Sequence, residues 1–210
     1  FITLTQPEIA AQLKKTPLVI LPAGSVEQHG PHLPTGTDIY AANVISHAVA
    51  ERMDGLVLPG GPLGVTPMHM PFEGTMTLSP ETYQSVVVES CASTAQHGAK
   101  RLMILNWHEG NIPSLAIASE KLHRDVGMSV IVVQACYVAA ELYGHDCGGL
   151  THGGEIEALA GDAGELREAA DKMHFDASLR LVVESLVAPA GHLEIGAELT
   201  VDAGEQIQIE

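Results

Sequence analysis

Four short apolar runs, rich in β-branched residues, divide the first two thirds of the chain. They span residues 17–22, 56–59, 102–105 and 130–133, and the segments between them carry apolar residues at helical spacing. Runs of this length and composition are typical of buried strands. Because strands and helices alternate, the order predicts a parallel sheet covered by helices, with right-handed crossovers. We therefore expect an α/β fold.

The predicted helices have recognisable first residues. Asp38 is expected to cap a helix through about residue 53 that ends at Gly55, and its carboxylate suits the positive end of the helix dipole. Ser79, which precedes Pro80, indicates the start of a second helix. Asn111 is expected to open a third. Each helix would then begin a few residues after a predicted strand or a long loop.

Length, charge and cysteine content narrow the class of protein. A chain of 210 residues suits one domain with a substantial core. With 26 acidic and 10 basic residues, the formal charge of −16 repels phosphate backbones and anionic membranes, so we expect neither nucleic acid nor a membrane as partner. Three cysteines without metal-type spacing, and no signal peptide or long apolar span, favour a cytoplasmic protein with reduced thiols.

The loop that follows the first predicted strand has the composition of a metal site. Residues 25–38 place Glu27, His29, His32 and Asp38 among glycines and prolines. Carboxylates and imidazole nitrogens are ligands that Zn²⁺ and Mn²⁺ accept, and so many ionisable groups beside a buried strand need compensation. The alternative is a polar loop satisfied by backbone hydrogen bonds.

Two later loops repeat this chemistry. Residues 106–111 carry His108 directly after a predicted strand, and residues 151–157 carry His152, Glu155 and Glu157. The carboxyl ends of parallel strands meet at one edge of a sheet, so loops at these ends can converge on one site. For the last loop, the alternative is a solvated helix start.

The three loops, together with residues 72–75, resemble the creatininase (creatinine amidohydrolase) family of metal-dependent hydrolases. The resemblance covers roughly residues 15–160 in the family's order. It implies a three-layer α/β sandwich with a mainly parallel central sheet, and we take residues 1–210 as a single domain whose part after about 160 matches poorly. A homo-oligomer, a hexamer by resemblance, is expected.

The resemblance also implies a site with two divalent ions, Zn²⁺ or Mn²⁺, with Fe²⁺ as a further option. One ion would bind Glu27, Asp38 and His108, and the other His29, Asp38 and a glutamate, so Asp38 would bridge. In creatininase that glutamate lies two residues after the loop histidine, where this chain has Gly110. Glu155 is therefore the candidate, as in relatives with a Gly-Gly loop.

The activity implied is hydrolysis of an amide-type C–N bond by a metal-activated water. The resemblance places the chain among amidohydrolases that act on C–N bonds other than ordinary peptide bonds, and substrates that fit include cyclic amides, formamides and small peptides. His152 would protonate the leaving nitrogen and Glu157 would orient it, while His69 and Trp107 would contact the small-molecule substrate. Creatininase closes tryptophans over creatinine, and Trp107 is the only tryptophan of this chain. Creatinine is therefore expected to be a poor substrate.

Two alternatives stay open at this stage. One is hydrolysis of a C–C bond in a cyclic diketone by the same site. The other is a catalytically silent metal-binding or assembly protein, which the lost ligand at Gly110 and the unmatched C-terminal part favour. Glu109 is a further candidate to replace the lost ligand, although its side chain is expected to point away.

Overall fold

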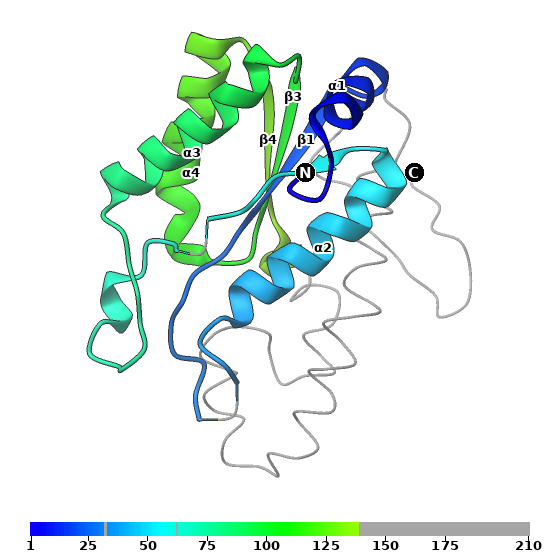
Figure 1. Cartoon of the computed structure of the whole chain (residues 1–210). Helices are drawn as coiled ribbons and strands as arrows, with labels where there is room; N and C mark the ends of the chain where they lie inside the picture. Colours follow the sequence, from blue (N-terminus) through cyan, green and yellow to red (C-terminus); the bar gives the residue numbers. More distant parts are fainter. Residues whose placement is uncertain (32, 62, 139–210) are drawn as a thin grey trace, which may run out of the picture.

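The structure is a computed structural model that describes residues 1–31, 33–61 and 63–138 (Figure 1). Its helices are α1 (Gln6–Lys15), α2 (Thr37–Met53), α3 (Pro80–Gln96) and α4 (Ile112–Lys121), with short helical turns η1 (Pro67–His69) and η2 (Glu109–Asn111) and a π-helical extension η3 (Leu122–Val126). Its strands are β1 (Leu18–Ala23), β2 (Leu56–Val57), β3 (Arg101–Asn106) and β4 (Ser129–Gln134).

The four strands form one parallel sheet in the order β2-β1-β3-β4. All four strands lie where the apolar runs predicted them, and their parallel pairing confirms the α/β prediction. The sheet is in register at its carboxyl edge, because Ala23 pairs with Asn106 and Asn106 pairs with Gln134. Three strands therefore end side by side, and the chain leaves each of them at the same edge.

Helices cover both faces of the sheet. Helices α3 and α4 lie together on one face and α2 lies on the other (Figure 1). Side chains along β1 alternate between the two faces: Val19 and Leu21 join the cluster with α3 and α4, whereas Leu18 and Ile20 join the cluster with α2. Each fully buried aliphatic side chain stabilises the fold by about 1.5–3 kcal/mol. The described part is thus a three-layer α/β arrangement.

Ser79 and Asn111 occupy the N-cap positions of α3 and α4, as the sequence predicted, whereas the start of α2 differs. Ser79 caps α3, because its hydroxyl accepts a hydrogen bond from the Thr82 backbone N–H at 3.2 Å. Asp38 is not a cap: Gly36 is the N-cap of α2, and Asp38 is the second helical residue. The prediction that it caps was wrong because its two oxygens are used elsewhere, as described below. It still lies in the first turn, where negative charge is favoured.

The prediction that α2 runs through about residue 53 is confirmed, because the helix ends at Met53. Asp54, not Gly55, takes the left-handed conformation that ends the helix, with φ of 54°. Its carboxylate accepts from the Thr16 hydroxyl at 2.8 Å and pairs with Lys15 at 2.8 Å, while Gln12 donates to its carbonyl at 2.7 Å. These contacts with α1 and the residue after it offset the strain of a non-glycine residue there.

Among the residues that the structure describes, no helix combines the length and the apolar composition needed to cross a bilayer.

Candidate metal centre

The site lies at the carboxyl edge of the sheet, where the loop after β1 meets the first turn of α2. Gly24 makes this meeting possible, because a Cβ at this position would lie 2.7 Å from the Asp38 carbonyl carbon and from the Ile39 nitrogen. With no side chain at residue 24, the two backbones approach closely. The chain then continues through Ser25 and Glu27 directly alongside Asp38.

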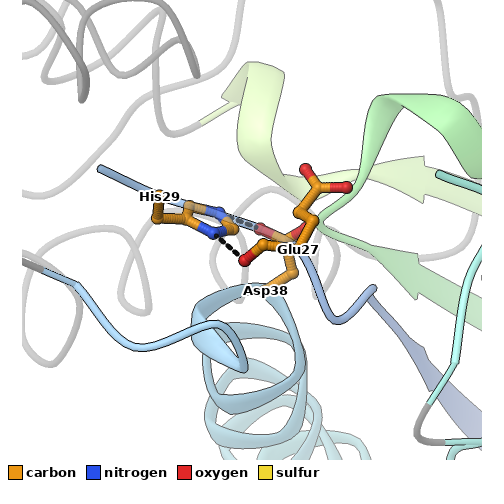
Figure 2. Close-up of side chains that lie close together, drawn as sticks. All are labelled: Glu27, His29 and Asp38. Carbon is orange, nitrogen blue, oxygen red and sulfur yellow. Dashed lines mark hydrogen bonds and ion pairs between the residues drawn. The ribbon is translucent and has the colours of Figure 1, made fainter. Parts of the chain in front are cut away.

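Glu27, His29 and Asp38 bring their polar atoms together in this corner (Figure 2). One ligand atom of each lies within 4.8 Å of those of the other two, and all three residues are buried, with 2–4% of their surface exposed. His29 Nε2 lies 3.0 Å from Asp38 Oδ1, and its Nδ1 lies 3.1 Å from the Glu27 carbonyl oxygen. Because a carbonyl only accepts, Nδ1 carries a proton, and Nε2 donates to the Asp38 carboxylate when the ring is protonated at both nitrogens.

His108, which follows β3, completes the cluster from the neighbouring strand end. Its Nδ1 lies 3.3 Å from Glu27 Oε1 and 3.3 Å from Asp38 Oδ2. The ring is buried, and its Nε2 lies 3.0 Å from the Val65 carbonyl oxygen. His69 is half-buried beside the cluster, with Nε2 3.9 Å from Glu27 Oε1 and Nδ1 3.3 Å from Gln28 Nε2. Two carboxylates and two imidazoles thus share one buried corner, and a third imidazole lies at its edge.

The carboxylates and His108 shift one another's protonation strongly. Burial raises the pKa of Asp38, but hydrogen bonds from His108 and His29 outweigh it and hold the pKa well below its ordinary value. Burial likewise raises the pKa of Glu27, and His108 brings it below the ordinary value. Burial lowers the pKa of His108, but Asp38 and Glu27 together raise it to about 10. In the metal-free protein, a protonated His108 therefore neutralises part of the buried negative charge.

The metal-free protein should lose stability as the pH rises from 6.5 to about 10. The pKa of His108 is raised from 6.5 to about 10, so its contribution to the free energy of unfolding is complete below 6.5 and is lost as the pH rises through about 10. Glu27 and Asp38, whose pKa values are lowered, affect stability in the acidic range, because their contribution to the free energy of unfolding is lost as the pH falls. Urea unfolding of chelator-treated protein across this range measures the effect.

His108→Gln should flatten this alkaline slope, since it removes the titrating group. His123→Gln serves as the matched control, because His123 lies outside the cluster and its Nδ1 donates to the Met128 carbonyl oxygen at 3.0 Å. It should leave the slope unchanged. An equal slope in wild type and His108→Gln would show that general charge repulsion, and not this ring, governs alkaline stability.

The donor set fits divalent ions of the Zn²⁺ or Mn²⁺ type. Buried carboxylates repel each other and are costly to keep charged without a cation, and imidazole nitrogens together with carboxylate oxygens are ligands that both metals accept. Glu27, His29 and Asp38 are the group whose ligand atoms lie within 4.8 Å of one another, and His108 Nδ1 lies 3.3 Å from an oxygen of each carboxylate.

The structure brings together four of the five predicted metal ligands: Glu27, His29, Asp38 and His108. The fifth, Glu155, and the predicted catalytic pair His152 and Glu157 lie outside the described residues. Each of these assignments stays a prediction.

The two predicted substrate contacts lie in different surroundings. His69 reaches the cluster through Glu27, so a place beside a substrate fits its position. Trp107 is 7% exposed and packs in the apolar cluster on the α2 face. Its role toward substrate stays a prediction.

The glycine at position 110, where the resemblance to creatininase implies a glutamate ligand, has a physical explanation. A Cβ at Gly110 would lie 2.2 Å from the Val65 carbonyl oxygen and 2.4 Å from His108 Nε2. A glutamate cannot enter there while His108 keeps this orientation. Glu109 is exposed, as the prediction that it points away requires.

Sequence reasoning missed one residue of the site. Ser25 is fully buried and its hydroxyl donates to Asp38 Oδ2 at 2.7 Å. It helps to fix the carboxylate and to lower its basicity. The available signal was its place, directly between the end of a buried strand and the first predicted ligand.

Comparisons with known proteins identify the family to which the chain is similar. A family model described as "Creatininase: Creatinine amidohydrolase" matches residues 3–184. The chain is 37% identical over 133 residues to a mycofactocin precursor peptide peptidase of Mycobacterium ulcerans, covering 57% of this chain and 53% of the relative. It is 33% identical to a creatinine amidohydrolase of Pseudomonas putida, covering 45% and 38%. It is 29% identical to a 3-dehydro-scyllo-inosose hydrolase of Thermotoga maritima, covering 63% and 43%.

Solved structures give the same relationship. A structure named "Creatininase Mn" matches with a TM-score of 0.57 and 29% identity, covering 68% of this chain and 62% of that one. A mutant creatininase of "Zn-Zn type" also matches with a TM-score of 0.57 and 29% identity, covering 67% and 62%. The chain spans about half the length of the mycobacterial peptidase it matches, and less of the other two relatives.

Proposed function

The chain belongs to the creatininase family, and on that premise we propose that it is a metal-dependent hydrolase of amide-type C–N bonds. The relatives it matches are hydrolases, and structures that resemble it are named with Mn and with Zn. Small peptides come first among the substrate classes, because the relative with 37% identity is named a peptide peptidase. Cyclic amides and formamides are the other two classes.

The observation that carries the proposal is the way Asp38 divides its two oxygens. Oδ1 faces His29 Nε2 at 3.0 Å, and Oδ2 faces His108 Nδ1 at 3.3 Å. One buried carboxylate with an imidazole nitrogen beside each of its oxygens supports the proposal that two ions share Asp38.

The chain's own residues would bind the ions, orient the substrate and move protons. Glu27, Asp38 and His108 would hold one ion, and His29, Asp38 and Glu155 the other; the ions would supply a nucleophilic water at neutral pH and polarise the substrate carbonyl. The low basicity of Asp38 and Glu27 keeps both charged at neutral pH. His152 would give a proton to the leaving nitrogen, with Glu157 orienting the ring. Burial of the cluster excludes bulk water from the charged groups.

Two other functions are favoured by specific observations. The relative named a 3-dehydro-scyllo-inosose hydrolase favours hydrolysis of a C–C bond in a cyclic diketone. Gly110, which has no room for the ligand known at this position, favours a silent metal-binding assembly protein. A homo-oligomer is proposed with either function, and light scattering of the purified protein measures its size.

Protein purified without chelator should contain two divalent ions per chain and hydrolyse an amide-type bond but open creatinine poorly. The reason for the last point is that the single tryptophan, Trp107, is buried, so the chain lacks a second tryptophan to stack on a flat ring. Elemental analysis measures the ions. Mass spectrometry of products measures turnover on short peptides, formamides, cyclic amides, a cyclic diketone and creatinine.

The outcomes separate the proposals. If only the diketone gave product, the proposed activity would be C–C hydrolysis and not C–N hydrolysis. Two bound ions without turnover on any class would favour the silent protein. Rapid ring opening of creatinine would mean that another side chain stacks on it. A metal content well below one ion per chain, unrestored by added Zn²⁺ or Mn²⁺, would refute the metal site itself.

A further inference from the structure

The strand-end loops of this protein are tied to one another by Asn111, the last residue of η2. Its side chain is fully buried. Oδ1 accepts from the Val65 backbone N–H at 2.9 Å, and Nδ2 donates to the Gly24 carbonyl at 3.0 Å and to Asn106 Oδ1 at 3.2 Å. One amide group thus links the loops that follow β1, β2 and β3.

Asn111 makes these bonds instead of its usual local one. It occupies the N-cap position of α4, where an asparagine side chain ordinarily accepts from the first turn of the helix. It makes no such cap bond here. The helix start gives up a bond worth about 1 kcal/mol, and the side chain spans the loops of the site. If the side chain served only to start the helix, it would accept a hydrogen bond from the first turn of α4 and would not bond the loops.

The peptide of Val65 is held on both sides by this arrangement. Its N–H donates to Asn111, and its carbonyl accepts from His108 Nε2 at 3.0 Å. A carbonyl has no proton to give, so Nε2 of His108 must carry one. Nδ1 is then the nitrogen left to face Glu27 and Asp38, each at 3.3 Å.

Gly110 leaves the space that this arrangement needs. A Cβ there would lie 2.2 Å from the Val65 carbonyl oxygen and 2.4 Å from His108 Nε2, on the hydrogen bond that joins them. Any side chain at residue 110 would push the ring or the carbonyl away. The glycine that removes a possible ligand therefore serves to orient another ligand.

We propose that Asn111 is a positioning residue: it fixes the Val65 peptide, which orients His108 so that Nδ1 points at Glu27 and Asp38. This inference deepens the proposed function and, for its metal readout, rests on it. The Asn111 side chain bonds Val65, Gly24 and Asn106, and none of these is among the proposed ligands. It acts by fixing the peptide that sets the ring nitrogen of a ligand, and a hydrogen-bond partner that orients a ligand is usually worth about 10–100-fold in metal affinity.

The first test uses metal-free protein and needs no bound ion. With ¹⁵N-labelled histidine, the Nε2–H of His108 should give a slowly exchanging ring-proton signal. Asn111→Ala should speed its exchange by about tenfold, the effect of losing roughly one hydrogen bond. Gly110→Ala should do the same from the other side. An Nδ1–H signal is expected as well, because His108 is protonated in the metal-free protein. Unchanged Nε2–H exchange in both variants, or the lack of an Nε2–H signal in the wild type, would overturn the proposal.

The second test uses Zn²⁺ as the probe. Chelator competition should show a loss of about 10–100-fold in zinc affinity for Asn111→Ala and for Gly110→Ala. The ¹⁵N shifts of the zinc-loaded wild type should show His108 bound through Nδ1. Binding through Nε2, or wild-type affinity in both variants, would also overturn the proposal. A wild-type protein that binds no zinc would refute the proposed function, and the first test would still decide the role of Asn111.

Three control variants separate positioning from general destabilisation. Asn43→Ala removes an asparagine hydrogen bond within α2, and Gly61→Ala adds a methyl group where no atom lies within 4 Å. Leu13→Ala destabilises the core at α1, away from the site. All three should keep wild-type zinc affinity and wild-type ring exchange. A loss of affinity in Leu13→Ala equal to that of Asn111→Ala would assign the effect to stability and overturn the proposal.

Discussion

Replacing Asp38 with asparagine should remove both divalent ions from the protein at once. The substitution keeps the shape of the side chain but removes its charge. Because Oδ1 faces His29 and Oδ2 faces His108, each ion would lose its shared ligand. We expect the affinity for Zn²⁺ to fall by more than the ~10–100-fold typical of an outer-shell partner. Elemental analysis and isothermal titration of the variant measure both stoichiometry and affinity.

Other substitutions in the same cluster distinguish a bridging ligand from a simple one. Glu27→Gln and His29→Gln should each lower the affinity for one ion and leave the affinity for the other unchanged, since each residue is proposed as a ligand of one ion only. Asp54→Asn is the matched control, because Asp54 pairs with Lys15 at the far end of α2 and should leave both ions bound. If Asp38→Asn kept one ion at full occupancy, the carboxylate would not bridge. If it kept two, Asp38 would not be a ligand.

Asp38→Asn should also change the stability of the metal-free protein in a defined direction. Asp38 and Glu27 together raise the pKa of His108, because both carboxylates stabilise its protonated form. With one carboxylate neutralised, the pKa of His108 should fall toward its ordinary value and the alkaline loss of stability should begin at lower pH. No loss of a helix cap is expected, because Gly36 occupies that position.

Replacing His152 with alanine should leave both ions bound and lower turnover by about a hundredfold or more, the usual scale for losing a general acid. The expectation follows from the resemblance of residues 152–157 to the family's loop. Turnover is measured on the best substrate of the panel, and metal content is measured on the same sample. Glu157→Gln should lower turnover less, since it acts only through the histidine.

His123→Ala is the control for a histidine outside the site and should keep full turnover. The result that changes the assignment is loss of an ion in His152→Ala, which would make His152 a ligand. Full activity of the variant on the true substrate would mean that the leaving group needs no acid from the protein. Partial recovery of turnover with added imidazole would support the proton-transfer role, because a diffusible imidazolium can donate the proton in place of the ring.

The residue pattern alone was enough to predict the strands, the parallel sheet and the convergence of the loops. Apolar runs of four to six residues between helical segments leave few alternatives to buried strands, and helical crossovers leave few alternatives to parallel pairing. From this, the closeness of Glu27 and His108 could be predicted, although they are far apart in sequence. Both follow strands that the structure pairs in register. The site was therefore predictable as a meeting of strand ends.

Tertiary structure alone decided the order β2-β1-β3-β4, the role of Asp38 and the orientation of the rings. Asp38 had the local signature of a helix cap, but the contacts of Ser25, His29 and His108 claimed its oxygens. These contacts depend on how closely two backbones approach, which no local pattern encodes.

The ring nitrogen that His108 turns toward the carboxylates was equally out of reach of the sequence. The acceptor that sets it is a backbone carbonyl, Val65, and any residue type offers the same carbonyl. In the sequence, Gly110 stood out because a ligand was missing there. In the fold, its lack of a side chain leaves room for the hydrogen bond between His108 and Val65. Local sequence specifies which groups are available, whereas only the packed chain fixes which atom of each group faces which partner.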